Sequence, residues 1–134
     1  MTTLSKDAIL AANDTKAETI SVPEWGGDVR IAVMSGLARD RFVEMQNDGQ
    51  TGYSVFQARL LATTIVDDAG NLLFTVEDVD KLRGKSRTVL DRLTQEAVRI
   101  NGMSVEAIER EEKNSDADPS GDSGSDSPSP SGNQ

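Results

Sequence analysis

The 134-residue chain contains no cysteine and no histidine, and these two absences exclude several kinds of chemistry. Without cysteine there is no disulfide and no thiolate nucleophile, and without histidine there is no Ser-His-Asp triad. A zinc site built from cysteine and histidine is excluded as well. We therefore expect no enzyme of these classes and no cofactor held by such ligands. A chain without cysteine also fits the cytosol.

Long apolar runs and strong basic clusters are also missing. No apolar run approaches the roughly 20 residues that cross a bilayer, and the N-terminus lacks the basic and apolar regions of a signal peptide. The net charge of −9 argues against a nucleic-acid binder, because phosphate contacts need clustered Lys and Arg. We expect a soluble protein without membrane or nucleic-acid partners that stays where it is made.

The C-terminal segment, residues 114–134, differs in composition from the rest of the chain. It holds three of the four prolines and four aspartates, with no Lys or Arg, so the first 113 residues carry a charge of −5. Such a segment cannot bury enough apolar surface to offset its chain entropy. We predict one folded domain over residues 1–113 and a disordered acidic tail over residues 114–134.

The N-terminal part predicts a short helix followed by a β-hairpin. Ser5 is a helix cap for residues 5–13, whose large apolar residues Ile9 and Leu10 must lie against something else for so short a helix to persist. Alternating β-forming residues on either side of the turn at Pro23 predict a hairpin over residues 17–34.

The central stretch, residues 54–82, organises the rest of the chain. Apolar residues recur at spacings of three and four from Val55 to Ile65, which predicts one helical stripe. A turn follows at residues 67–71, and Leu72–Phe74 is interpreted as a buried extended segment. Thr75 is expected to cap the next helix, with Glu77 and Asp78 in its first turn.

Three further helices are predicted around this centre. One starts at Ser35, with Phe42 and Met45 on its apolar side, and a last, half-exposed helix starts at Ser104. Ser86 is expected to cap the longest amphipathic run, whose apolar residues are Val89, Leu90, Leu93, Ala97 and Ile100. The fold class is therefore α+β: an N-terminal hairpin or small antiparallel sheet packed against several short helices.

Three apolar residues are candidates for binding a partner. Trp25, the only tryptophan, is either an exposed anchor or a side chain folded over the small sheet, and the second reading is favoured. Val105 and Ile108 are the only large apolar residues of the last predicted helix, so they are the other two candidates.

Metal-binding and catalytic patterns are weak. Asp67-x-Ala69-x-Asn71 lacks an oxygen ligand at its third position and has Leu72 where a calcium loop requires glycine, so a tight turn is favoured. Adjacent acids at 67–68, 77–78 and 111–112 lack neighbours that would tune a pKa. The basic residues of segment 81–92 could meet an acidic partner, although a solvated connector is favoured. We assign no catalytic and no metal-binding residue.

Several short stretches resemble the tail assembly chaperones of long-tailed, non-contractile bacteriophages and related prophages. They occur in the expected order over most of residues 5–113. The stretches are Ser5-Lys6 with Ala8 to Asp14, Val22 to Gly27 with Val29, Ala58-Arg59-Leu60, Ile65-Val66-Asp67, Gly70-Asn71, Leu73-Phe74-Thr75, and Asn101-Gly102 with Ser104.

The resemblance implies a non-enzymatic assembly factor in the host bacterial cytoplasm. Proteins of this family bind the helix-rich tape measure protein before the tail tube forms around it, and they are generally absent from the finished virion. A groove between amphipathic helices could cover apolar helical surface while negative charge keeps the complex soluble. The family pattern marks no partner-contact residue, and whether the chain forms a homo-oligomer stays open.

The family also commonly makes a longer product by a −1 ribosomal frameshift. Glu112-Lys113-Asn114 could be encoded as GAA AAA AAC, which contains the slippery heptamer A AAA AAC. We hypothesise that the longer product replaces the segment from Asn114 with another domain, which could reach the major tail protein. Other codons at 112–114, or no overlapping −1 frame in the gene, would exclude this.

Two rival functions remain. A structural head–tail connector or tail completion protein of the virion also fits a small acidic α+β domain, and mass spectrometry of purified particles separates it from a chaperone. A DNA mimic that inhibits a host nuclease is the other, but Arg and Lys interspersed through residues 30–99 make it poor.

Overall fold

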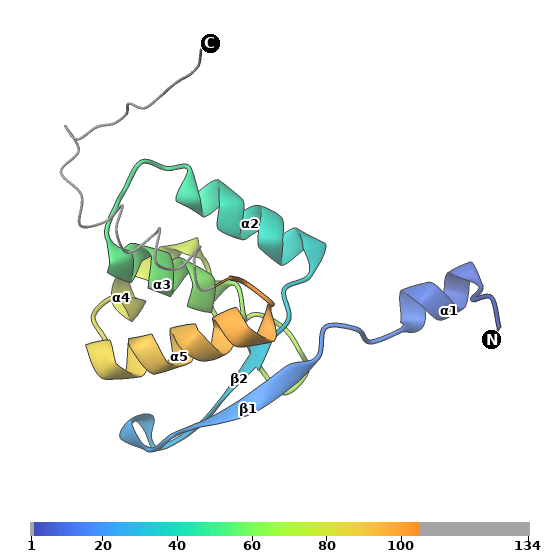
Figure 1. The fold of residues 1–134 in the computed structure, drawn as a ribbon, viewed down its shortest axis with the longest axis horizontal. Coiled ribbons are helices and arrows are strands. Elements are labelled where there is room, and N and C mark those ends of the chain that lie inside the picture. Colours follow the sequence, from blue (N-terminus) through green and yellow to red (C-terminus); the bar gives the residue numbers. More distant parts are fainter. Residues whose placement is uncertain (1, 105–134) are drawn as a thin grey trace, which may run out of the picture.

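The structure is a computed structural model, and it describes residues 2–104. Val105, Ile108 and the predicted tail over residues 114–134 lie outside the described residues. Figure 1 shows a small sheet with helices packed against it, which confirms the predicted α+β class. The elements are α1 (Lys6–Ala11), β1 (Ala17–Val22), η1 (Pro23–Trp25), β2 (Gly27–Ala32), α2 (Gly36–Gln46), α3 (Tyr53–Ala62), β3 (Ile65–Val66), η2 (Val76–Asp78), α4 (Val79–Leu82) and α5 (Arg87–Ile100).

The predicted hairpin over residues 17–34 is confirmed. β1 and β2 pair antiparallel from Ala17↔Ala32 to Val22↔Gly27. The short helix η1 makes the turn, and Gly26 ends it with a φ of 81°, a conformation that side chains with a Cβ rarely adopt. The strand order is β1-β2-β3, and β3 pairs with β2 only at Arg30 and Ile31.

The central helix is shorter than the sequence predicts. α3 ends at Ala62, and Ile65, which the spacing placed on the helical stripe, lies in strand β3. The hydroxyl of Thr63 donates to the carbonyl oxygens of Arg59 and Leu60, and the hydroxyl of Thr64 donates to that of Leu60. These bonds satisfy carbonyls that a longer helix would use, so two threonines end the helix.

The prediction of a buried extended segment at Leu72–Phe74 is confirmed only in part, because Phe74 packs against the core but Leu73 is exposed. Leu72 makes one isolated antiparallel bridge with Val66, and Leu73 is 54% exposed. The predicted cap at Thr75 is confirmed: its Oγ1 accepts from Glu77 N, and its own N–H donates to Asp78 Oδ2 at 2.9 Å. The apolar run is therefore a short link into a capped helix, not a core strand.

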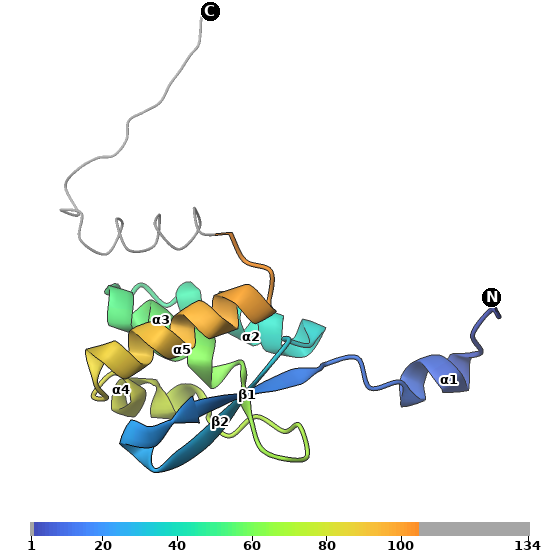
Figure 2. The ribbon, with the colours of Figure 1, turned by 60° about the horizontal axis from the view of Figure 1, so that its bottom comes forward.

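α5 lies against both α3 and the hairpin, as the two ribbon views show (Figure 1; Figure 2). Its predicted stripe is confirmed, because Val89, Leu90, Leu93 and Ala97 are buried in the main core with residues of α3 and the sheet. The predicted Ser86 cap is wrong, because the Ser86 side chain makes no capping hydrogen bond to α5. None of the helices among the described residues is long and apolar enough to cross a membrane. The core is thus a three-way contact of α3, α5 and the sheet.

α1 stands apart from this body. Ser5 caps it as predicted, with its Oγ accepting from Ala8 N at 3.1 Å. Both ribbon views show α1 projecting from the hairpin on an extended segment (Figures 1 and 2). None of its residues is buried, so the support that this short helix was expected to need does not come from residues 2–104.

Candidate partner-binding surface

The N-terminal arm, residues 4–16, carries three exposed large apolar side chains. Leu4, Ile9 and Leu10 are 63%, 56% and 73% exposed. Single exposed apolar residues are normal on protein surfaces, but three on one projecting arm are better explained by a partner that covers them. We therefore take the arm as the first candidate surface.

The second candidate surface is the outer side of α2. Ser35 caps α2 as predicted, while Phe42 packs on the main core and Met45 on a smaller cluster. The side chains of Leu37 and Val43 stay exposed. Between α2 and the link to η2 lies an open groove of about 420 Å³, lined by Met45, Phe74 and Val76 among others.

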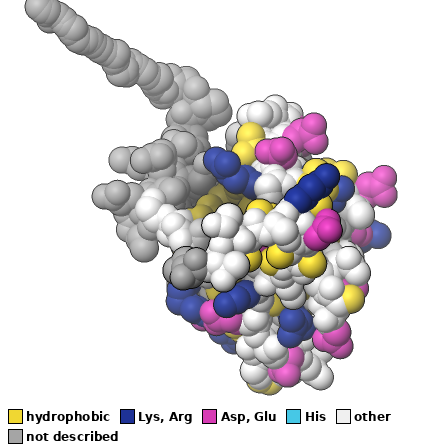
Figure 3. Space-filling view, turned by 90° about the vertical axis from the view of Figure 1, so that its right-hand side faces the viewer, with side chains coloured by type: hydrophobic (Ala, Val, Ile, Leu, Met, Phe, Trp, Pro, Cys, Tyr) yellow, Lys and Arg dark blue, Asp and Glu magenta, His cyan; other side chains and the backbone are white. Residues whose placement is uncertain are grey.

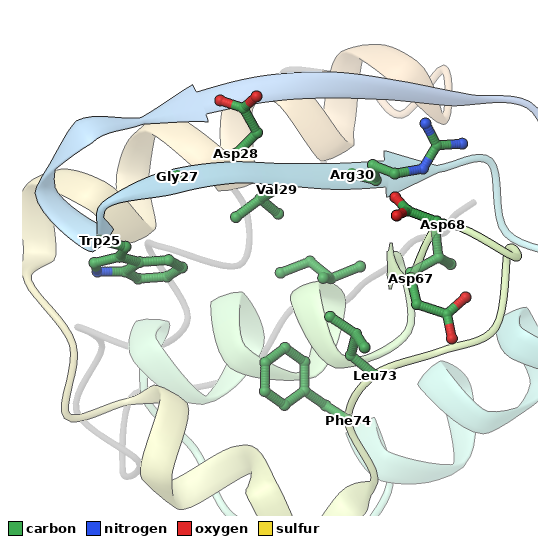
Figure 4. Close-up of a pocket in the computed structure, with 11 residues that line it drawn as sticks. Trp25, Gly27, Asp28, Val29, Arg30, Asp67, Asp68, Leu73 and Phe74 are labelled. Carbon is green, nitrogen blue, oxygen red and sulfur yellow. The ribbon is translucent and has the colours of Figure 1, made fainter.

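The third candidate surface surrounds Trp25 and is called the slot below. It is a cavity of about 460 Å³ between β2 and the Leu73–Phe74 link, with Val29 and Ile65 in its wall. Figure 4 shows the Trp25 indole at one end of the slot, beside the start of β2. The indole is folded toward the sheet yet 37% exposed, so its role as a partner contact stays a prediction.

Charges of both signs surround the apolar side chains on one face of the molecule (Figure 3). Figure 3, which looks at the side from which α1 projects, shows hydrophobic patches divided by Lys, Arg, Asp and Glu. The face in view therefore offers several small apolar contacts and no single large apolar sheet. Val105 and Ile108, the other two predicted contact residues, lie outside the described residues.

The basic segment 81–92 is largely occupied by ion pairs. Arg92 makes a bidentate pair with Glu24 at 3.0 and 2.8 Å, which lowers the pKa of Glu24 to about 2. Arg83 contacts Asp80, and Arg87 contacts Asp91. These pairs favour the solvated connector over a basic patch for an acidic partner.

The Asp67–Asn71 segment is a tight turn. Asp67 Oδ1 accepts from the N–H groups of Asn71 and Ala69, at 2.9 and 2.8 Å. These bonds, with that from Asn71 the largest cause, lower the pKa of Asp67. Within residues 2–104 no group of three or more acidic, His or Cys side chains could hold a metal ion.

Sequence reasoning missed one buried cation. Arg59 of α3 is 3% exposed and donates to Gln46 Oε1 and Asp48 Oδ1, which ties α3 to the end of α2. Asp48 lies in the polar loop between α2 and α3. An arginine among apolar residues at helical spacing is expected to face water. The one sequence signal for this contact is an acidic residue, Asp48, eleven positions before Arg59.

No protein-family model matches the sequence, and no curated protein matches it. Among solved structures, the chain is similar to the tail assembly chaperone of bacteriophage HK97, with a TM-score of 0.52 and 22% sequence identity. The match covers 73% of this chain and 94% of the HK97 chain. The chain thus has the fold of a phage tail assembly chaperone. The resemblance indicated by the sequence is confirmed at the level of the fold.

Proposed function

We propose that this chain is a bacteriophage tail assembly chaperone that binds the tape measure protein and keeps it soluble during tail assembly, without catalysis. The observation that carries the proposal is the shared fold, which extends over 94% of the HK97 tail assembly chaperone. A match over nearly all of that protein leaves little of it without a counterpart here.

The exposed apolar surfaces suit such a partner. A tape measure protein is a long chain with apolar helical surface, and grooves or arms with apolar side chains cover such surface through contacts at helical spacing. The arm offers Leu4, Ile9 and Leu10, and the α2 groove offers Met45, Phe74 and Val76. The net charge of −9 favours solubility of the complex.

The proposal places the protein in the host bacterial cytoplasm and outside the mature virion. A chaperone acts before the tail tube closes around the tape measure protein, so it is released from the assembled particle. A head–tail connector of the same size would remain in the particle. Mass spectrometry of purified virions therefore separates the two functions.

Co-expression with the tape measure protein from the same gene cluster tests the proposal. We expect the tape measure protein to be insoluble alone and to become soluble and co-elute with this chain. If it stays insoluble and nothing co-purifies, the chaperone function is excluded. Recovery of the chain from purified virions in stoichiometric amount would also overturn the proposal and favour the connector.

A further inference from the structure

One edge of β2 ends without a strand beside it. β3 pairs with β2 at Arg30 and Ile31 only, and no other strand among residues 2–104 continues along that side toward Gly27. Both backbone polar groups of a residue in an antiparallel strand point to one side, and the side alternates along the strand. Ala32 N donates to Thr64 O on the β3 side, so Asp28, four residues earlier, presents its N–H and C=O to the same side.

The slot lies along this free edge. Its volume of about 460 Å³ is within the usual range for ligand pockets, and its apolar walls come from Trp25, Val29 and Phe74. Figure 4 shows Trp25 and Phe74 opposite the stretch of β2 that has no strand partner. An extended segment placed there would bond to the Asp28 backbone and insert alternate side chains between these walls.

The charges around the slot define the ligand further. Asp28, Asp67 and Asp68 line it, and Arg30 is the one cationic residue among its lining residues. The Arg30 side chain rises from β2 on the side away from Trp25 and Phe74, as Figure 4 shows, so it does not face these apolar walls. Three carboxylates against one guanidinium leave an acidic rim, which attracts Lys or Arg and repels an acidic segment.

This charge argues against the chain's own C-terminal segment as the occupant. Residues 114–134 contain four aspartates and neither Lys nor Arg. A strand with apolar residues alternating with basic ones satisfies both the walls and the rim, since alternate side chains of a strand point to opposite faces.

We propose that the slot binds an extended segment of a partner protein, with alternating apolar and basic side chains, as a strand added to the free edge of β2. This goes beyond the proposed function, which concerns apolar helical surface, and does not depend on it. The backbone of Asp28 supplies the strand bonds, Trp25 and Phe74 hold an apolar side chain, and Asp28 and Asp68 attract the basic ones.

The probe for this proposal is the capped peptide K-V-K-V-K-V-K, titrated into the full chain. Trp25 is the only tryptophan, so its fluorescence reports on the slot directly. We expect a saturable change in Trp25 emission, together with shifts of the Gly27–Val29 amide resonances. The matched peptide E-V-E-V-E-V-E has the same valines and should bind at least tenfold more weakly, since two or more rim charges oppose it. Equal binding of both peptides, or no response at Gly27–Val29, would overturn the proposal.

Two further comparisons isolate charge and backbone. The double variant Asp28→Asn/Asp68→Asn should weaken the lysine peptide about fivefold, while Asp40→Asn on α2 should leave its Kd unchanged. One peptide N-methylated on its valines and one N-methylated on its lysines test strand pairing, because only one edge of the peptide faces β2. We expect one version to lose binding and the other to keep it. An unchanged Kd in the double variant, or full binding by both methylated peptides, would contradict strand addition.

The outcome is separate from that of the tape measure experiment. A soluble tape measure complex with no peptide response removes the slot proposal alone. Peptide binding with an insoluble tape measure protein removes the proposed function alone.

Discussion

The two helices α1 and α5 lie in opposite environments. Each follows a serine at its N-terminal boundary and carries large apolar residues. α5 buries six of its fourteen residues against α3 and the sheet, whereas α1 buries none of its six. An apolar pattern therefore predicts that a helix needs a partner surface, and it does not say whether that surface belongs to the same chain.

The difference lies in how each helix is tied to the sheet. Asn101, at the end of α5, accepts from Met34 N at 2.8 Å and donates to Ala32 O at 3.2 Å. Arg92 and Arg99 of α5 pair with Glu24 and Glu18 of the hairpin. α1 has no counterpart of these ties among the described residues. Its apolar surface therefore stays available to another molecule.

The largest expected effect is on the α5 side of this comparison. Leu93→Ala removes a fully buried side chain and should lower the free energy of unfolding by about 3–4 kcal/mol. Ile9→Ala is the matched change on α1 and should stay within about 0.5 kcal/mol of the parent. Urea unfolding followed by circular dichroism measures both. Similar losses in the two variants would mean that α1 is packed in the free chain.

Asn101→Ala should have the next largest effect. It leaves the Met34 N–H and the Ala32 carbonyl without their side-chain partner, which costs roughly 2 kcal/mol in a partly buried site. Asn13→Ala, beside α1, is the control and should be near neutral, because Asn13 is exposed. A neutral Asn101→Ala in urea unfolding would show that these bonds do not hold α5 to the sheet.

Acid should selectively weaken the ion pairs that join α5 to the hairpin. The hydrogen bond from Arg92 lowers the pKa of Glu24 from 4.5 to about 2, and that from Arg99 lowers the pKa of Glu18. Because both folded pKa values lie below the unfolded value, the stabilisation is present above pH 4.5 and is lost as the pH falls toward 2. Parent and Glu18→Gln/Glu24→Gln chains should therefore differ in stability at pH 7 and converge at pH 2. A constant difference across this range would contradict the assignment.

The smallest effect on stability should come with the largest effect on partner binding. Ile9→Gln/Leu10→Gln should leave unfolding unchanged within about 0.5 kcal/mol, because both side chains are exposed. Recovery of soluble tape measure protein on co-expression should fall about tenfold or more, if the arm supplies contact anchors. Lys6→Gln/Ala11→Gln changes the same helix without removing its large apolar residues and should behave as the parent. Equal recovery from both double variants would exclude the arm as a contact.

The sequence predicted the elements whose signals are local. The Ser5, Ser35 and Thr75 caps, the hairpin and the α5 stripe all follow from neighbouring residues, and the structure confirms them. The errors arose where distant contacts decide the outcome. Ile65 continued an apolar period of three and four, but Thr63 and Thr64 end α3 and pairing with Ile31 makes Ile65 part of the sheet.

The candidate site was less predictable than the fold. Trp25 stood out because it is the only tryptophan, but the free β2 edge beside it depends on β3 being two residues long. The slot carboxylates come from a strand and a turn almost forty residues apart, so no local spacing brings them together. The exposure of Ile9 and Leu10 was likewise hidden, since a short apolar helix has the same sequence whether it is covered or not.

Hydrogen exchange of the free chain and of its complex with the tape measure protein tests the central claim most directly. In the free chain, the amides of α1 should exchange orders of magnitude faster than those of α5, because a six-residue helix without packing is marginal in water. In the complex, α1 should become protected while α5 changes little. Slow exchange of α1 in the free chain, or unchanged fast exchange of α1 in the complex, would contradict the account.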